Sequence, residues 1–400
     1  MTREALHFGF DALYVAFQGS VSEKTREALT RAKEQAQHVG KPVYTVISGI
    51  AGHVGATGTR GGYRYKFDQG PLAAKWLIKE SDNPTEWNLY CEVPAMALVE
   101  YGIEQCIDDI WADLKAFDAR IISNAVNRFD VAVDIMDADF ILRPERISAH
   151  SHSTVQRFGQ SEAGNNDFQI IGGSRIETVT IGKMPNRQVT IYDKRKQVIY
   201  SQKSHWWKFW DRKKEETPAV WRVELRFGKK YLKRSGIVTL DDMLTRGGDL
   251  VAQAFDDVKY LDQDNASHVN ATRSKLDEFW AFARDLLIRF ASGAMVGGKH
   301  VNVREVIRED HKKFCEKQII GFFKNMAATR LDLPDFPDAK NHHHKVNFLH
   351  NLTRDVVRRM ECFQGKAWHE FQDGVQKVRK KYHYLERKMI DERKIQRRAV

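Results

Sequence analysis

The segment Arg128-Phe-Asp-Val-Ala-Val-Asp134 has the two-residue alternation of a β-strand with one apolar and one acidic face. Alternate side chains of a strand share a face, so Asp130 and Asp134 point the same way, about 13 Å apart along the strand. The residue midway between them, Ala132, is small and leaves room for a ligand against the sheet. The pattern predicts a sheet strand whose carboxylates face away from the core.

Two later segments alternate in the same way. The segment Val220-Trp-Arg-Val-Glu-Leu-Arg-Phe227 puts Arg222 and Glu224 opposite its apolar side chains. In Val189-Thr-Ile-Tyr-Asp-Lys194, Tyr192 and Lys194 share a face. If the three strands are neighbours, these polar faces converge on one site. The alternative is an ordinary solvent-facing sheet with cross-strand ion pairs.

The surrounding pattern predicts an α+β fold with a largely antiparallel sheet, followed by a mostly helical part. We place the domains at residues 1–245 and 246–400. The Gly-rich stretch 49–62 lacks the GKS or GKT of a phosphate-binding loop and is interpreted as a hairpin connection. The expected strands are 8–19, 42–50, 63–67, 88–93, 167–171 and 177–182, and the expected helices are 21–39, 94–117 and 141–158.

Composition narrows the class of protein. The 400 residues carry a net charge of +11, and excess Lys and Arg favours association with nucleic acid. No apolar run reaches the roughly 18–20 residues needed to span a bilayer, and the N-terminus has no apolar stretch of signal-peptide length. We therefore expect a cytoplasmic protein without a membrane partner. The four cysteines are widely spread, which argues against a disulfide framework or a zinc site: Cys91, Cys106, Cys315 and Cys362.

One tyrosine, several carboxylates and many cations together suggest the breaking and rejoining of a DNA phosphodiester. Carboxylate oxygens of Asp130, Asp134 and Glu224 suit Mg²⁺ or Mn²⁺, which would polarise the phosphate. A tyrosine has a pKa near 10 and needs help to act as a nucleophile at neutral pH. A neighbouring cation such as Lys194 or Arg222 would supply positive charge.

The same residues resemble the Rep_trans family of rolling-circle replication initiators, found on staphylococcal-type plasmids, filamentous phages and integrative conjugative elements. That family has an R-x-D-x-A-x-D strand, then a Gly-containing strand leading to Y-D-K or Y-N-K, then an aromatic-R-x-E strand. Their counterparts here are Arg128–Asp134, Thr180-Ile-Gly182 leading to Ile191–Lys194, and Trp221-Arg-Val-Glu224. The resemblance covers about residues 8–245.

The resemblance implies a replication initiation protein that nicks one strand of origin DNA. Tyr192 would form a 5′-phosphotyrosine and free a 3′-OH, and Asp130 or Asp134 with Glu224 would hold the metal. The family often has Arg two residues before the tyrosine, where this chain has Thr190, and the nearest arginine is Arg187.

The stretch 203–214 has no counterpart in the family. Its tryptophans and lysines suit either stacking on bases of single-stranded DNA or packing on the sheet.

Two other functions remain open from the sequence. One is the relaxase of a conjugative element, and the other is a non-enzymatic DNA-binding regulator on the same fold. The expected partner is DNA, as origin duplex and as single strand. A second copy of the chain and a host helicase remain open as further partners.

Three further patterns lie outside the central motifs. Apolar residues spaced 4, 3, 4, 3, 4 from Phe371 to Met389 form a short heptad seam amid many cations, which predicts a helix that contacts DNA or a second subunit. The pair His150 and His152 has a serine between its members, unlike a two-histidine metal motif. The run His342-His-His344 is expected to be a solvated loop.

Overall fold

The computed structural model describes residues 3–149, 155–158, 176–262, 274–292, 303–329, 342–362 and 364–381. The chain divides into two compact units, Met1–Val303 and Arg304–Val400. The predicted boundary between residues 245 and 246 falls inside helix α6 (Leu240–Asp257), which packs on the sheet and on α7 (Glu278–Ser292). The first unit is therefore longer than the sequence pattern indicated.

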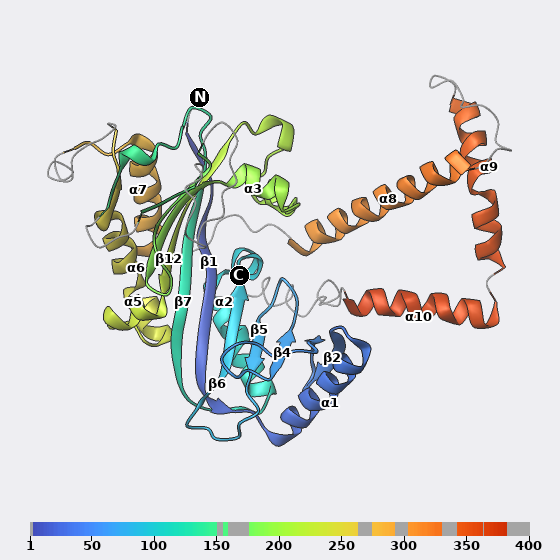
Figure 1. Ribbon diagram of the computed structural model, residues 1–400, viewed down its shortest axis with the longest axis horizontal. Coiled ribbons are helices and arrows are strands. Elements are labelled where there is room, and N and C mark those ends of the chain that lie inside the picture. Colours follow the sequence, from blue (N-terminus) through green and yellow to red (C-terminus); the bar gives the residue numbers. More distant parts are fainter. Residues whose placement is uncertain are drawn as a thin grey trace, which may run out of the picture. The chain divides into compact units, whose positions relative to one another are not determined.

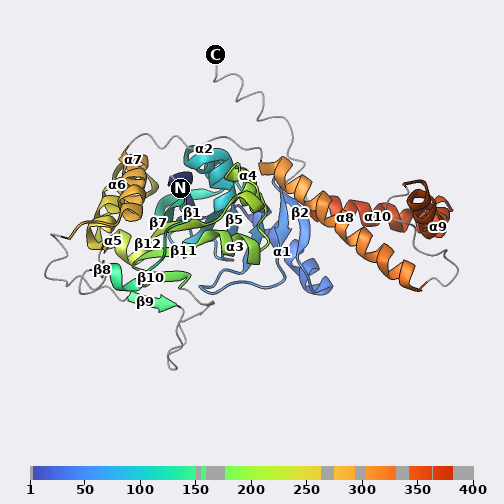
Figure 2. The same cartoon turned by 90° about the horizontal axis from the view of Figure 1, so that it is seen from above.

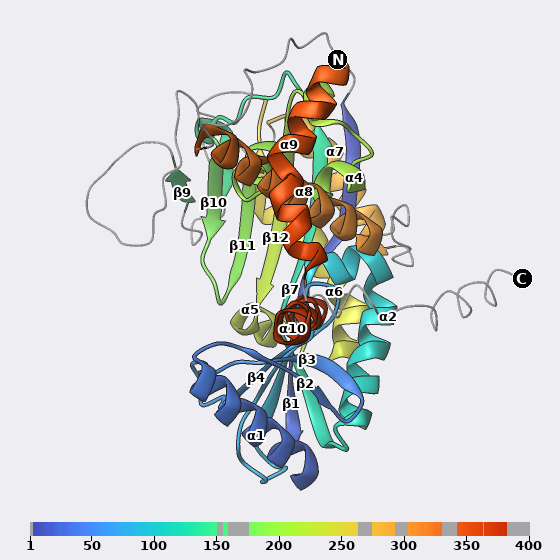
Figure 3. The same ribbon diagram turned by 90° about the vertical axis from the view of Figure 1, so that its right-hand side faces the viewer.

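The first unit is an α+β fold built on a large antiparallel sheet, as predicted. Among the described residues the sheet has 11 strands in the order β2-β3-β4-β5-β6-β1-β7-β12-β11-β10-β9. Figure 3 shows β10, β11 and β12 side by side. The strands are β1 (Glu4–Ser20), β2 (Val43–Ile47), β3 (Ile50–Val54), β4 (Tyr65–Asp68), β5 (Lys75–Ile78), β6 (Trp87–Pro94), β7 (Arg120–Met136), β9 (Val155–Phe158), β10 (Thr178–Gly182), β11 (Arg187–Asp193) and β12 (Val220–Gly228).

Helices of the first unit flank the sheet, with α6 and α7 on one side of the central strands and α3 on the other (Figures 1 and 2). Helix α1 begins after Ser22, whose hydroxyl caps the amide of Thr25, and ends at Gly40 with a φ of 68°. Besides α6 and α7, the helices are α1 (Glu23–Val39), α2 (Ala95–Ala116), α3 (Lys194–Tyr200), α4 (His205–Phe209) and α5 (Lys229–Arg234).

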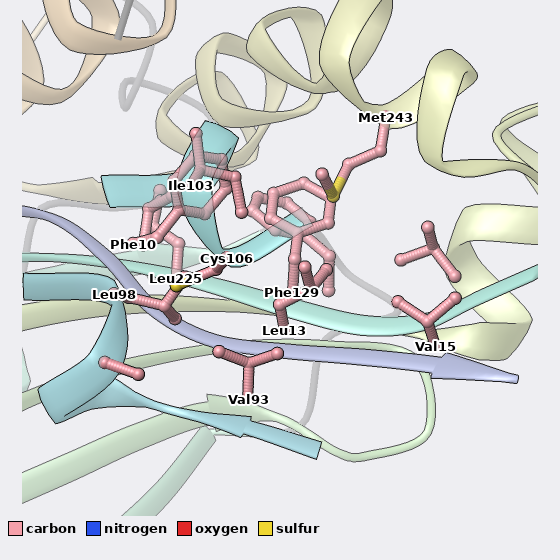
Figure 4. Close-up of a cluster of buried hydrophobic side chains, with 14 of the residues drawn as sticks. Phe10, Leu13, Val15, Val93, Leu98, Ile103, Cys106, Phe129, Leu225 and Met243 are labelled. Carbon is pink, nitrogen blue, oxygen red and sulfur yellow. The ribbon is translucent and has the colours of Figure 1, made fainter. Parts of the chain in front are cut away.

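One continuous apolar cluster lies on the side of the sheet that α2 and α6 cover. Figure 4 shows Leu13 and Phe129 from the strands with Ile103 from α2 and Met243 from α6. The apolar alternate positions of β1 and β7 supply this core, so the intervening positions of these strands face the other way. The acidic face predicted for Arg128–Asp134 is thus opposite the main core.

The predicted helix at 141–158 is wrong. A 3-10 turn at Pro144–Arg146 leads into strand β8 (Ile147–Ala149), which pairs with β13 (Val258–Tyr260). The strand β9 follows. The apolar residues of this segment are spaced as in a helix, but the segment pairs with a strand over 100 residues later in the sequence. A local sequence pattern contains no information about such a distant partner. The predicted strand at 167–171 and the pair His150 and His152 lie outside the described residues.

The second unit is helical in its described parts, as predicted. It contains α8 (Val303–Thr329), α9 (His342–Glu361) and α10 (Gly365–Lys381). The run His342-His-His344, expected to be a loop, begins α9 instead. Phe371, the first residue of the heptad seam, is partly exposed on α10, and the seam beyond Lys381 lies outside the described residues. None of the helices in the described part of the chain has the length and apolar character of a membrane-spanning segment.

Candidate active site

Strand register brings the predicted site residues into one row across the sheet. Tyr192 of β11 pairs with Arg222 of β12, and Arg222 pairs with Asp134 of β7. The next position along β12, Glu224, pairs with Ala132 of β7. The three strands are therefore neighbours, as the converging polar faces required.

Arg222 is the central cation of this row, with only 1% of its side chain exposed. Its Nε and Nη2 donate to the two carboxylate oxygens of Asp134 at 2.5 and 2.8 Å. Its Nη1 donates to Asp11 of β1 at 2.7 Å. Burial would lower the pKa of Arg222, but the two carboxylates raise it well above its ordinary value, so the guanidinium stays charged.

The same contacts fix the charge of Asp134. Burial would raise the pKa of Asp134, but the charge and hydrogen bonds of Arg222 hold it below its ordinary value. A bidentate pairing of this kind fixes orientation as well as charge. Asp134 is therefore an ionised partner of Arg222.

The side chain of Lys194 lies near Tyr192 of this row, although Lys194 itself follows the last residue of β11 and belongs to α3. The side chain of Asp193 accepts from the amide of Lys196 and starts α3, whose first residue is Lys194. The Lys194 ammonium nitrogen lies 5.7 Å from the ring centroid of Tyr192 and 4.4 Å from that of Trp206. Burial lowers the pKa of Lys194 to about 7, and the charge of Arg222 acts in the same direction. A basic amine with this pKa is poised to exchange protons near neutrality.

Tyr192 is 8% exposed and lies beside these charges. Burial raises the pKa of its phenol well above 10, and the negative charge of Glu224 raises it further, while Arg222 acts in the opposite direction. The phenol is thus protonated at neutral pH and needs a local base to become a nucleophile.

Asp130 and Glu224 form a second group of carboxylates, one step further along the sheet. Arg226 donates to Glu224 at 2.7 Å and lies 4.0 Å from Asp130, while the Nε of Arg128 donates to Asp130 at 2.8 Å. Burial raises the pKa of Asp130 to about 7, Arg128 opposes this, and the like charge of Glu224 adds to it. These two carboxylates share Arg226 between them.

The carboxylates predicted as metal ligands thus fall into two groups. Asp134 has both oxygens occupied by Arg222, and one of them also accepts from Trp210. Across the described residues, no group of three or more His, Cys, Asp or Glu side chains is arranged to hold a metal ion. Asp130 and Glu224 remain as a pair of oxygen donors of the kind that Mg²⁺ or Mn²⁺ prefers.

Two tryptophans of the segment 203–214 complete the site and were not predicted as part of it. The Trp206 ring lies 4.5 Å from the guanidinium carbon of Arg222. The Trp210 indole donates to Asp134 at 2.9 Å. Both side chains are buried, so these rings pack on the polar face of the sheet, which was the second interpretation of this segment.

Asp11 is a further site residue that the sequence analysis missed. The register of β1 against β7 shifts between Phe10 and Ala12, so Asp11 is the extra residue of a β-bulge. The sequence does contain a signal for this bulge. The alternating apolar residues stand at even positions in Phe8 and Phe10 and at odd positions from Leu13 onward. A phase change of this kind marks a bulge, and bulges re-aim side chains.

Known proteins resemble this chain in structure and not in sequence. No protein-family model matches the sequence, and no curated protein matches it. Among solved structures, the chain is similar to a rolling circle replication initiator protein from Geobacillus stearothermophilus, at 14% identity and a TM-score of 0.37, over 72% of this chain and 97% of that one. A likeness at this level does not assign a function, so the function proposed below rests on the site.

Proposed function

We propose that this protein is a DNA strand transferase that nicks one strand of origin DNA through Tyr192 and so starts rolling-circle replication. The observation that carries the proposal is the placement of Tyr192 beside two cations: Arg222, its register partner on β12, and Lys194, which begins α3 two residues further along the chain. The Tyr192 hydroxyl, a fixed guanidinium and an amine of lowered pKa can supply the nucleophile, the positive charge and the base that phosphoryl transfer to tyrosine needs. The rolling-circle setting comes from the resemblance of the three motifs to the Rep_trans family.

The chemistry follows from the roles these groups can take. Neutral Lys194 accepts the phenolic proton while the Tyr192 oxygen attacks the phosphorus. The bond to phosphorus from the 3′-oxygen breaks, and that oxygen leaves as a hydroxyl after taking a proton from Lys194 or water. Arg222, held by Asp11 and Asp134, stabilises the charge that develops on the phosphate oxygens. The phosphotyrosine conserves the energy of the broken bond, so the reverse reaction can rejoin the strand.

A divalent metal, if the reaction uses one, would be held by Asp130 and Glu224. Their oxygens suit Mg²⁺ or Mn²⁺, and Arg226, which bridges them here, would have to move aside. Bound there, the ion would polarise the scissile phosphate. In this proposal Asp134 does not bind the metal. It pairs with Arg222 and positions the guanidinium.

The test is a nicking assay on supercoiled plasmid that carries the DNA flanking the protein's own gene, with Mg²⁺ or Mn²⁺. The wild type should give open circles that carry a covalent protein adduct stable to SDS. The variant Tyr192→Phe should give neither product, because it removes only the nucleophilic oxygen. The matched control Tyr200→Phe changes a tyrosine that is 70% exposed at the end of α3 and should nick normally.

Three outcomes would count against the proposal. Tight DNA binding without nicking under either metal would favour a non-enzymatic DNA-binding regulator. The row of Tyr192, Arg222 and Asp134 would then serve only the stability of the sheet. Nicking that survives Tyr192→Phe would place the nucleophile elsewhere. Nicking at a transfer origin instead of a replication origin would point to a relaxase.

A further inference from the structure

A row of partly exposed tyrosines continues from the site along the polar face of the sheet. Tyr14 of β1 is flanked in register by Arg128 of β7 and Glu92 of β6. Its neighbours in β1, Leu13 and Val15, point into the core on the opposite side. Tyr14 therefore lies on the same face as the candidate active site.

Two more tyrosines extend this row. The ring of Tyr14 lies 6.2 Å from that of Tyr90 on β6, and the ring of Tyr90 lies 5.9 Å from that of Tyr63. Tyr63 directly follows the Gly-rich stretch 49–62, where Gly61 and Gly62 have φ values of 88° and 82°. Glycine adopts this backbone readily, and the turn brings Tyr63 against β6. All three side chains are half-buried, so each keeps a partly exposed surface.

Cations accompany these rings. The Arg128 guanidinium lies 5.1 Å from the Tyr14 ring centroid, and the Lys79 ammonium lies 5.7 Å from that of Tyr63. Acidic groups are also present on this face, and Glu92 is paired with Lys75. Burial raises the pKa of Tyr14 and Tyr63, so their hydroxyls stay uncharged and do not repel a phosphate.

Arg128 connects this row to the active site. While its guanidinium lies over Tyr14, its Nε donates to Asp130 at 2.8 Å. The aromatic row and the proposed phosphate chemistry therefore meet at one residue. A chain of bases lying on the tyrosines would enter the site past Arg128.

We propose that Tyr14, Tyr63 and Tyr90, with Arg128 and Lys79, form a tyrosine track that binds single-stranded DNA on one side of the cleaved phosphate. Aromatic faces stack on bases of any sequence, and interleaved cations pair with the phosphates, which is the usual chemistry of single-strand binding. Duplex DNA keeps its bases stacked inside, so this surface favours a strand that has already been separated. The inference rests on the proposed function and names the form of its substrate.

The test uses the full chain with Tyr192→Phe as background, so that binding is measured without cleavage. The probe is a fluorescent oligothymidylate of about 15 nucleotides, within the length that one such surface covers. Tyr63→Leu and Tyr90→Leu should each lower affinity by about 5-fold to 150-fold, the range for losing one base–aromatic stack. The matched control Tyr101→Leu changes a half-buried tyrosine of α2, on the opposite side of the sheet, and should bind as the background does.

A second variant and a second measurement separate this surface from other basic parts of the chain. Lys79→Gln should lower the slope of log affinity against log salt by about 0.7, the value for one lost phosphate contact with a single strand. An oligonucleotide carrying 5-iodouracil should crosslink under light to Tyr14, Tyr63 or Tyr90, as mapped by peptide mass spectrometry.

The outcomes distinguish this inference from the proposed function. Unchanged affinity in both leucine variants, with crosslinks only outside the track, would overturn the inference even if the wild type nicks plasmid. Loss of affinity in the variants, in a protein that never nicks, would support the track and overturn the nicking function. Tighter binding of the matching RNA than of the DNA would overturn the assignment to DNA.

Discussion

Asp134 accepts two hydrogen bonds from Arg222, at 2.5 and 2.8 Å, between side chains that are 0% and 1% exposed. Arg222 is also bound to Asp11. A buried guanidinium that serves two carboxylates is difficult to remove, because each carboxylate would be left in a poorly solvating environment. This arrangement holds Arg222 in one orientation between β1 and β7.

The first prediction compares the two ends of this pairing. Arg222→Met leaves two carboxylates without their cation, so it should lower the free energy of unfolding by about 3–5 kcal/mol. Asp134→Asn leaves Arg222 paired with Asp11 and should lower it by about 1–3 kcal/mol. Urea unfolding followed by tryptophan fluorescence measures both, with the exposed Asp82→Asn as control. An equal decrease in the free energy of unfolding of both variants would contradict the idea that Asp11 still pairs with Arg222 when Asp134 is neutral.

The second prediction concerns the Trp210 indole, which donates to Asp134 at 2.9 Å. Trp210→Phe keeps an aromatic ring and removes the donor, so it should lower the free energy of unfolding by about 1–2 kcal/mol. Nicking should also slow, because Asp134 would hold Arg222 less firmly. Trp207→Phe is the matched control, since its half-buried ring packs 5.2 Å from that of Trp210. If both variants unfold alike, the hydrogen bond contributes nothing.

The third prediction is a pH dependence of stability that originates from Lys194. Its pKa is about 7 in the folded protein and near 10.5 when unfolded. Between these values the unfolded state binds more protons, so stability rises with pH, by up to about 1.4 kcal/mol per pH unit from this group. In the variant Lys194→Met, the free energy of unfolding should rise less between pH 7 and pH 10 than in the wild type. Parallel curves for wild type and variant in urea titrations would show that Lys194 titrates normally.

The same lysine gives the nicking rate a predicted pH profile. As the proposed base, Lys194 acts in its neutral form, so the rate at saturating DNA should increase up to about pH 7 and then level off. Lys194→Met should be slower and lose this inflection. A residual rate that keeps the inflection would assign the base to another group.

The fourth prediction concerns the metal. If Asp130 and Glu224 are its ligands, Mn²⁺ should raise the melting temperature of the wild type and leave Asp130→Asn and Glu224→Gln unchanged, since only a folded site gains from binding. Differential scanning calorimetry measures this without any cleavage. Asp82→Asn, exposed and remote in sequence, is the control and should respond as the wild type does. A full Mn²⁺ response in both ligand variants would exclude this pair.

Local alternation in the sequence was sufficient for the α+β class and for the faces of the three strands. It put Asp134, Arg222 and Tyr192 on the polar side of their strands, and the register confirms that they meet. It failed at 141–158, where β8 pairs with a distant segment. It also placed the end of the first unit too early, since the burial of α6 and α7 on the sheet is a long-range contact.

The sequence by itself determined which face each strand residue occupies, because side-chain direction in a strand follows from backbone geometry alone. Only the tertiary structure decided which charges pair: that Asp134 belongs to Arg222, that Asp11 joins them across a bulge, and that Trp206 covers Arg222. The energy of a buried charge depends on the groups within a few ångströms in space. That neighbourhood is assembled from β1, β7, β11, β12 and α4, and no window of sequence contains it.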